Sequence, residues 1–299
     1  MVDGIISINK PVKTSSFRVV SKIKRFLKAN KVGHGGTLDP LAKGVLLIFV
    51  GRATKFSKYA LDCSKEYLCK ITFGHSMNTF DLEGEISGEK KVPDLNPDLI
   101  NYHLSQYIGE IEQTPPIHSA IKIKGKPAYH YARKNIDITM SPRKVSIYDI
   151  SLIEWNGLDL ILKISTSKGF YVRSFADEIG KVFGSLSYLS GLSRTRVGNF
   201  NQSESIDLDY LINIDLNETD LNNIILSPDK LLQHFGAIQI SADLIDKFVE
   251  KKPFCVKNLK KYSNYRVYDK KNNFLGTASF GNSNNTLIRN ELYKIDNSL

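Results

Sequence analysis

The sequence predicts an α+β protein with one large domain followed by a small β-rich domain. Its 299 residues are more than one typical core needs and fewer than three would use. Helix-like and strand-like segments are mixed along the larger part, whereas short strand-like runs with Asn- and Gly-rich turns follow Phe235-Gly236. The second pattern is typical of a small barrel of about 60 residues.

The first expected elements surround a glycine-rich loop. Ser15-Ser16 can cap a helix, because apolar residues recur at helical spacing after it, namely Val19, Val20, Ile23, Phe26 and Leu27. The segment Gly33–Pro40 contains too many glycines for a helix or a central strand, and the apolar run Val45–Val50 is strand-like. We therefore expect Asp39 in a loop that leads into a sheet.

The middle of the chain supplies further strands and a second helix. Tyr67–Phe73 alternates as a half-buried strand does, and Leu160–Ile164 also reads as a strand. A helix is expected from about Tyr171 to Val182, with Arg173 in its first turn. Two polar segments, residues 76–97 and 201–229, are expected to run over the surface.

Composition excludes several classes of protein. With 41% hydrophobic and 24% charged residues, the chain is neither collagen-like nor disordered nor a coiled-coil rod. No apolar run approaches the roughly 20 residues of a bilayer span, and the start Met1-Val2-Asp3-Gly4 has no apolar targeting segment. Three cysteines, Cys63, Cys69 and Cys255, cannot all pair with each other, so we expect a reducing cytoplasm.

The charge is sorted by region. Lys and Arg exceed Asp and Glu by 41 − 31 = 10, and residues 1–60 alone hold 12 basic and 2 acidic side chains. Lys122–Lys144 is basic and interleaved with Tyr129, His130 and Tyr131, whereas Ser203–Asp229 holds seven acids and no base. Clustered cations are expected for a polyanionic partner, although a general surplus of lysine would be an alternative explanation.

Familiar catalytic and cofactor motifs are absent from the sequence. The cysteine spacing does not match zinc sites, so no metal site is expected. Gly33-His34-Gly35-Gly36 fits neither of the phosphate-binding patterns G-x-x-x-x-G-K-[ST] and G-x-G-x-x-G. The G-x-S-x-G motif that would indicate a serine triad is absent.

Four single residues are candidates for chemistry, and each has a structural alternative. Asp39 before Pro40 can be a turn former, but three nearby glycines would let a backbone approach a ligand. His34 and Tyr67, taken alone, are more often a hydrogen-bonded histidine and a core aromatic. Arg173 in a first helical turn is disfavoured by the helix dipole, so an anionic partner is expected, either structural or functional.

Taken in order, the motifs resemble the TruB-type tRNA pseudouridine-55 synthases. The resemblance rests on Ile8–Pro11 with Ser15-Ser16, Gly33–Leu46, Lys65-Glu66-Tyr67, Gln113–Pro116 with Ser119-Ala120, Lys122, Gly125, Tyr129 and Ala132-Arg133, and Ser167–Ser174. It covers residues 4 to about 200. Gly35 and Phe170 depart from the family pattern, which usually has Thr or Ala at the first position and Thr at the second.

The resemblance implies a fold, a reaction and a partner. The fold would be the pseudouridine synthase fold, a twisted and mostly antiparallel sheet with flanking helices, in a catalytic domain of residues 1–236. An RNA-gripping insertion would lie around residues 113–145, and residues 237–299 would form a small PUA-like RNA-binding domain. The chain would isomerise uridine 55 in the T-loop of tRNA without a cofactor and as a monomer, with no membrane and no obligatory protein partner.

The resemblance also assigns roles to residues. Asp39 would be the catalytic nucleophile or base, Arg173 would keep its carboxylate charged and aimed, and Tyr67 would lie against the uracil. Whether Asp39 adds to C1′, adds to C6 or removes a sugar proton stays open. The target uridine would be flipped out of its stack. Contacts to RNA would come from His34, Lys10, Tyr171, Lys122, Lys124, Lys126, Arg133 and Lys134.

A second hypothesis belongs to another class, an RNA-binding or RNA-remodelling protein that keeps the scaffold without turnover. It predicts the same basic patches and the same C-terminal barrel. Asp39 together with Arg173 and Tyr67 discriminates between the two, because a carboxylate repels phosphate and binding alone does not need one.

Overall fold

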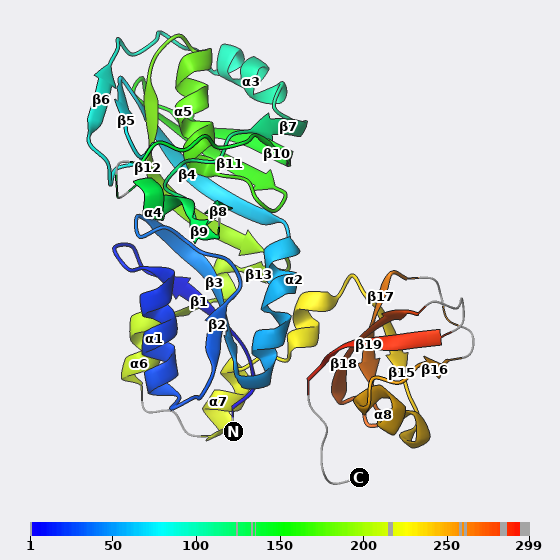
Figure 1. Cartoon of the computed structure of the whole chain (residues 1–299). Helices are drawn as coiled ribbons and strands as arrows, with labels where there is room; N and C mark the ends of the chain where they lie inside the picture. Colours follow the sequence, from blue (N-terminus) through cyan, green and yellow to red (C-terminus); the bar gives the residue numbers. More distant parts are fainter. Residues whose placement is uncertain are drawn as a thin grey trace.

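The computed structural model describes residues 2–123, 125–132, 134, 136–214, 218–256, 259, 262–281 and 286–293. These residues form a large sheet with helices around it and a separate five-stranded sheet near the C-terminus (Figure 1). None of the helices in these ranges is both long and apolar enough to cross a membrane.

The large sheet is mixed, and most of its neighbouring strands are antiparallel. Its order is β14 (Ile206–Asp207), β1 (Gly4–Lys10), β3 (Ala42–Val50), β12 (Ser187–Val197), β4 (Lys65–Phe73), β11 (Asp159–Thr166), β10 (Arg143–Trp155) and β7 (Gly109–Gln113), with β2 (Val32–His34) beside β3 and β13 (Phe200–Asn201) beside β12. Only the pairs β1–β14 and β3–β12 are parallel. The prediction of a mostly antiparallel sheet is therefore confirmed, and β3, β12 and β4 lie at its centre.

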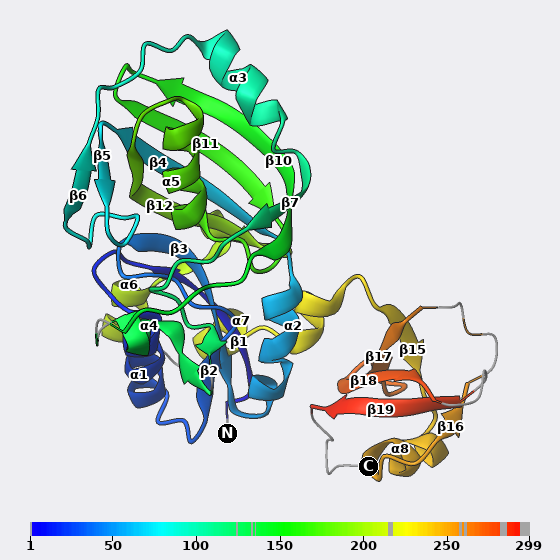
Figure 2. The same cartoon turned by 45° about the horizontal axis from the view of Figure 1, so that its top comes forward.

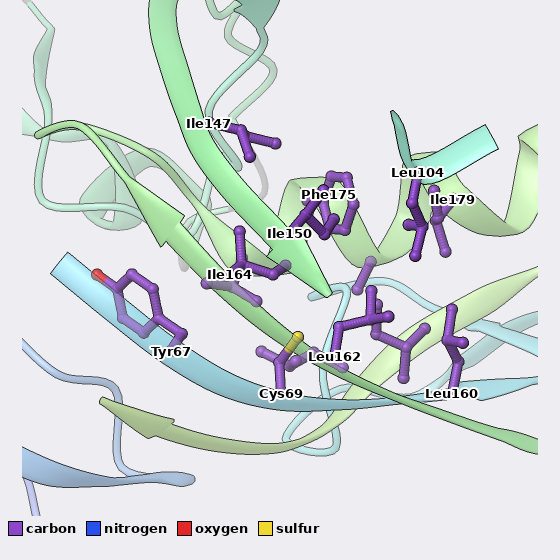
Figure 3. Close-up of a cluster of buried hydrophobic side chains, with 14 of the residues drawn as sticks. Tyr67, Cys69, Leu104, Ile147, Ile150, Leu160, Leu162, Ile164, Phe175 and Ile179 are labelled. Atoms are coloured by element: carbon purple, nitrogen blue, oxygen red, sulfur yellow. The ribbon is translucent and has the colours of Figure 1, made fainter. Parts of the chain in front are cut away.

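Helices cover the sheet in two groups. α5 (Val172–Val182) and α3 (Pro97–Ser105) pack on β4, β10 and β11 (Figure 2). Figure 3 shows aliphatic side chains of β10 and β11 meeting Phe175 and Ile179 of α5 and Leu104 of α3. α1 (Ser16–Phe26) and α6 (Leu208–Asn213) pack on the β1–β3 part through a second apolar cluster. The two clusters cover the same face of the sheet over its two halves, since Leu192 of β12 packs against both, and their burial holds the helices there.

The helix ends follow from identifiable contacts. The Ser15 hydroxyl accepts a hydrogen bond from the Arg18 N–H, so α1 begins as its cap predicts. α5 begins after Tyr171 with no side-chain cap of its own. Gln113 supplies the constraint instead, because its Oε1 accepts from the Tyr171 N–H at 2.7 Å and its Nε2 donates to the Tyr171 carbonyl at 3.1 Å.

Both polar segments contain more structure than the sequence predicts. Residues 76–97 include a short pair of strands, β5 (His75–Met77) and β6 (Ile86–Glu89), and bury Asp81. The expectation that residues 201–229 form only a surface connection is wrong. Its described part adds β14 beside β1, the helices α6 and α7 (Glu218–Ile224), and short 3-10 turns at Gln202–Glu204 and Pro228–Leu232. Leu208 and Leu211 of α6 are buried in the core, which explains why this segment does not simply cross the surface.

The basic insertion stands apart from the large sheet. It forms a two-stranded sheet of its own, β8 (Lys122–Ile123) and β9 (Lys126–Pro127), followed by the short helix α4 (Ala128–Ala132). The predicted contact residues Lys124 and Arg133 lie outside the described residues.

The C-terminal sheet has the order β15 (Gly236–Gln239), β17 (Asn264–Tyr268), β18 (Phe274–Phe280), β19 (Thr286–Leu292) and β16 (Phe254–Cys255), and α8 (Ala242–Val249) packs on it. The strands expected around residues 265–268 and 274–280 are confirmed, whereas α8 was not expected. The sheet contacts the 3-10 helix η1 (Gly51–Phe56) and α2 (Ser57–Asp62), where Phe56 meets Phe274 and Tyr293. A further ion pair joins Lys58 to Glu291.

Candidate active site

Asp39 lies in the loop between β2 and β3, as its sequence context predicts. Two contacts shape this loop. The Ser16 hydroxyl accepts from the Leu38 N–H at 2.8 Å and donates to the Leu38 carbonyl at 3.0 Å, which ties the loop to the start of α1. A Cβ on Gly35 would lie 2.5 Å from the Ala60 Cβ and 2.8 Å from the Phe49 ring, so packing accounts for the glycine at this unusual position.

Arg173 joins Asp39 to the helix α5. Its Nε lies 3.0 Å from Asp39 Oδ2, and its Nη2 donates to the His118 carbonyl at 2.9 Å. The Arg173 side chain is 7% exposed and the Asp39 side chain 33%, so the guanidinium is shielded from water while the carboxylate still faces the open side of the site. The anionic partner expected for Arg173 is thus Asp39.

Asp81 is a second carboxylate beside the same guanidinium, and sequence reasoning missed it. Its Oδ2 lies 3.5 Å from Arg173 Nε, and its Oδ1 accepts from the Thr79 hydroxyl and the Glu83 N–H. The residue is 2% exposed, although it belongs to a stretch that reads as polar surface. No local pattern marks it, because its burial depends on the distant α5.

The Asp39 carboxyl is subject to opposing influences. Burial raises its pKa above the ordinary value, Arg173 opposes this rise, and the negative charge of Asp81 adds to it. Lys10 also lowers the pKa of Asp39, but more weakly than Arg173. Because burial outweighs the effect of Arg173, this carboxyl takes up a proton more readily than an exposed aspartate does.

Tyr67 lies on β4 and reaches the same site from the sheet. It is buried with Cys69, Ile71 and Phe73 on one face, as the alternating pattern predicts. In Figure 3 its phenol oxygen is turned away from Cys69 and Leu162. Burial raises the pKa of Tyr67, and a hydrogen bond from Arg194 only partly opposes this, so the phenol carries its proton at neutral pH.

Arg194 is the second residue that sequence reasoning missed. It lies on β12, between β3, which follows the Asp39 loop, and β4, which holds Tyr67, and it is 3% exposed. Its Nε donates to the Val45 carbonyl at 2.8 Å, and its two terminal nitrogens donate to the carbonyls of Gly36 at 3.1 Å and Thr37 at 3.3 Å. A charged residue within a strand was the available signal. Arg194 thereby fixes the loop before Asp39 and contacts Tyr67 as well.

Lys65, at the start of β4, fastens α2 to the site. Its buried Nζ donates to the carbonyls of Ala60, Leu61 and Cys63, which are left unpaired near the end of that helix. Burial lowers the pKa of Lys65 to about 8. The resemblance included Lys65 in a motif but gave it no role, and the structure gives it a positional one.

These groups surround a cavity of about 370 Å³. Asp39, Tyr67, Arg173 and Arg194 line it, together with Tyr171 and other residues of the loops around α5 and the insertion, Phe170 and Ser119 among them. This volume lies within the range of sites for small ligands. Phe170, the second departure from the family pattern, packs against Phe175 at 5.8 Å between ring centroids and forms an apolar wall.

The residues predicted to contact RNA fall into three groups. His34 and Tyr171 lie close to the cavity: His34 Nδ1 accepts from the Gly36 N–H at 3.3 Å, and the Tyr171 phenol contacts Ser119. Burial lowers the pKa of His34, so its ring is neutral at pH 7. The three described insertion lysines, Lys122, Lys126 and Lys134, are exposed.

Lys10 differs from the insertion lysines in its burial. It is fully buried, and its Nζ donates to the carbonyls of Pro11 at 2.9 Å and Thr14 at 2.7 Å. Burial lowers its pKa to about 8. In this structure the ammonium holds the turn between β1 and α1, and the RNA contact expected for Lys10 stays a prediction.

In the described part of the chain, no group of three or more His, Cys, Asp or Glu side chains is arranged to hold a metal ion. Cys63, Cys69 and Cys255 are free thiols.

Similarity to known proteins agrees with this geometry. Residues 24–172 match the N-terminal domain of the TruB family pseudouridylate synthases. Two relatives carry the name tRNA pseudouridine synthase B. The protein of Clostridium kluyveri is 38% identical over 92% of this chain and 94% of its own, and that of Chromobacterium violaceum is 35% identical over 89% and 87%.

Solved structures agree in fold. One chain of a Cbf5-Nop10-Gar1 complex matches this protein with a TM-score of 0.76 at 23% identity. The match covers 97% of this chain and 85% of that one. An H/ACA RNP bound to a substrate RNA containing 2′-deoxyuridine gives a TM-score of 0.74 at 21% identity, over 98% of this chain and 85% of that one. The architecture is that of a pseudouridine synthase. The chain belongs to the TruB family of pseudouridylate synthases.

Proposed function

We propose that this chain isomerises uridine to pseudouridine at position 55 in the T-loop of tRNA, with Asp39 as the catalytic nucleophile or base. Membership of the TruB family and the names of the relatives support the reaction and the tRNA substrate. The observation that carries the proposal is the Asp39–Arg173 ion pair at the wall of a cavity that Tyr67 also lines. An RNA-binding surface alone would not require a half-buried carboxylate there.

The reaction breaks the bond between N1 of uracil and C1′ of the ribose and forms a bond between C5 and C1′. The C5 proton is released and N1 takes up a proton, so atoms and electrons balance without an oxidant or a reductant. Asp39 holds the detached sugar or base during this exchange, by addition to C1′, by addition to C6 or by removal of a sugar proton. Arg173 keeps the carboxylate charged and oriented.

Tyr67 acts against the uracil ring. Because its pKa is raised, the phenol stays protonated at neutral pH, and it can take up the C5 proton only as a phenolate, which the hydrogen bond from Arg194 favours. Arg194 is therefore assigned a positioning role, since it links the phenol to the loop that carries Asp39.

The RNA must deliver its uridine into the cavity by base flipping, because a stacked base cannot reach the carboxylate. We assign His34 and Tyr171 to the nucleotides around the flipped base. Lys122, Lys126 and Lys134 contact the backbone of the T-arm, as do Lys124 and Arg133 by resemblance. Their exposure supports this assignment for the three described lysines.

Residues 1–236 are assigned to the catalytic domain and residues 237–299 to a PUA-like RNA-binding domain. The five-stranded sheet, built only from residues after His234, supports this division. One chain supplies all the groups of the site, so we propose a monomer. The cytoplasmic location expected from the unpaired cysteines stays a prediction.

The test uses the release of the C5 hydrogen. Unmodified tRNA and an isolated T-arm stem-loop, both labelled with tritium at C5 of uridine, are incubated with the chain. We expect tritium in water at one equivalent per RNA, and a pseudouridine-specific readout at position 55. Binding of both RNAs without tritium release would favour the non-catalytic hypothesis instead.

A further inference from the structure

A second cleft, of about 520 Å³, lies at the end of β3 remote from Asp39. It is lined by the residues that follow α1 and by η1, and four of them are cationic: Lys28, Lys31, Arg52 and Lys55. The nine residues of β3, at about 3.3 Å each, put this cleft roughly 25 to 30 Å from the cavity. It is therefore a separate site.

The four cations lack carboxylate partners. Within the described ranges, none of them lies within 4.0 Å of an Asp or Glu oxygen. Asp3 is the acid in the lining, and its Oδ1 already accepts from the Arg52 N–H at 2.7 Å. All four cationic residues are exposed. A concave group of like charges without counter-charges is a site for an anionic ligand.

The backbone holds these cations in place. The Gly51 N–H donates to the Lys31 carbonyl at 2.8 Å, which joins the loop after α1 to the start of η1. Lys28 has a left-handed φ of 48°, uncommon for lysine, and it ends the turn that follows α1. The Tyr293 hydroxyl donates to the Asp3 carbonyl at 2.8 Å, so the residue that follows β19 of the C-terminal sheet contacts a residue that lines the cleft.

Helix α1 connects the cavity to this cleft. Its start is tied to the Asp39 loop through Ser16, and its last residues lead directly to Lys28. Over its roughly 16 Å, Arg18, Lys24 and Arg25 are exposed and have no carboxylate partner in the described part of the chain. Phe17, in the first turn, is 77% exposed and offers a face on which a base can stack. The cations thus form a track that begins at the catalytic loop.

We propose that this cleft binds backbone phosphates of the substrate RNA that lie outside the T-arm stem-loop. The identity of the RNA rests on the proposed function. When one nucleotide of a folded tRNA lies in the cavity, other parts of the same tRNA can lie along the cations of α1. The cleft at Lys28 is the end of that line of cations. Exposed lysines and arginines suit phosphates because they neutralise charge without a fixed geometry.

The experiment compares two pairs of lysines with equal charge. Lys31→Ala/Lys55→Ala removes two cations of the cleft, and Lys90→Ala/Lys91→Ala removes two exposed, unpaired cations that follow β6 at the other end of the molecule. Binding of full-length tRNA and of the T-arm stem-loop is measured with both variants and the unsubstituted chain, at salt concentrations from 50 to 300 mM. These concentrations span roughly the range over which phosphate contacts show their salt dependence.

For full-length tRNA, the cleft pair should flatten the plot of log affinity against log salt by about one to two units, because each lost phosphate contact removes about 0.9. The stem-loop slope should not change, and the control pair should leave both slopes unchanged. An unchanged tRNA slope, an equal loss for the stem-loop or an equal loss in the control pair would overturn the proposal. Lysine-dependent binding to phosphatidylserine vesicles with an unchanged tRNA slope would show a membrane contact and overturn it too.

Because these readouts need no turnover, they separate the cleft from the chemistry. Failure of the unsubstituted chain to release tritium from either RNA would contradict the proposed function, whatever the slopes are. Normal tritium release with unchanged slopes would contradict the cleft alone.

Discussion

The floor of the cavity and the β8–β9 insertion beside it present their cations in opposite ways. Arg173 and Arg194 are buried, and each guanidinium is surrounded by hydrogen-bonding partners: carboxylates and a carbonyl for the first, three carbonyls for the second. Lys122 and Lys126 of the insertion are exposed, and no carboxylate lies within ion-pair distance of them in the described structure. One region fixes its charges, and the other leaves them free to move.

This difference matches two different tasks. A group that stabilises a reacting atom must already be oriented, since reorganisation during the reaction adds to the barrier. A group that neutralises phosphates gains by adapting to the RNA and is worth most at low salt. Substitutions in the floor should therefore change turnover, and substitutions in the insertion should change affinity and its salt dependence.

The largest effect is expected for Asp39→Asn. The substitution keeps the volume and removes the charge, so kcat should fall by at least about a thousandfold while RNA affinity stays within about tenfold. Tritium release and RNA binding are measured on the same protein. Substantial turnover by Asp39→Asn would show that Asp39 is not the catalytic residue. The catalytic task assigned to the cavity floor would then be wrong.

The next effect is expected for Arg173→Lys, which keeps the charge. An ammonium cannot reproduce both the Nε contact to Asp39 and the Nη2 bond to the His118 carbonyl, so the carboxylate loses its orientation. We expect kcat to fall by about a hundredfold, with a small change in KM. Near-normal turnover would mean that a positive charge is enough and that the planar geometry is not needed.

A loss of about tenfold in kcat is expected for Arg194→Lys, because one ammonium replaces three hydrogen bonds to the carbonyls of Val45, Gly36 and Thr37. Arg196→Lys is the control, since Arg196 lies on the same strand and does not line the cavity. A merely structural role would lower Tm without changing kcat of the folded enzyme. Turnover measured at saturating RNA and at a temperature well below the Tm of the variant distinguishes a positioning role of Arg194 from a merely structural one.

Much of this floor has a local signature, and the part that lacks one depends on contacts distant in sequence. The Ser15 cap, the alternation of Tyr67–Phe73 and the position of Asp39 before a strand can all be predicted from neighbouring residues. The burial of Asp81 and of Lys10 cannot, because a polar residue in a turn carries no sign of the helix or turn that will cover it. Arg194 carries a weak sign, a charge within a strand.

The site roles themselves come from resemblance to a family. Geometry adds what the resemblance did not contain, namely that Arg173 lies between two carboxylates and that Arg194 joins the Asp39 loop to Tyr67. It also explains Gly35, whose neighbours Phe49 and Ala60 leave no room for the usual side chain. Sequence patterns predict elements and candidate residues, whereas packing decides which candidates meet.

A smaller effect is expected for Asp81→Asn, and it concerns pH. The negative charge of Asp81 raises the pKa of Asp39, so a neutral amide should lower that pKa. Activity that requires the Asp39 carboxylate is lost as pH falls through this pKa, and the acid limb of kcat/KM should therefore move to lower pH. A pH profile from about 4 to 8 measures the shift. Movement to higher pH would mean that Asp81 acts mainly by orienting Arg173.

The smallest effect on turnover is expected for Lys122→Ala/Lys126→Ala in the insertion. Both residues belong to the β8–β9 pair, but the pairing uses their backbone and their side chains are exposed, so folding should be unaffected. At saturating RNA, kcat should stay within about twofold of the unsubstituted chain, because no group of the floor depends on these lysines. Affinity should fall, and its salt dependence should flatten by about one to two units.

The two RNAs give this last prediction its contrast. Lysines that grip the T-arm near the flipped base should flatten the slope equally for the stem-loop and for full-length tRNA, whereas the Lys31 and Lys55 pair of the remote cleft should act on full-length tRNA alone. Lys90→Ala/Lys91→Ala again serves as the matched control. A large fall in kcat at saturating RNA would mean that the insertion shapes the cavity through His118 and Tyr129, which line it, and the division between a fixed floor and an adaptable grip would fail.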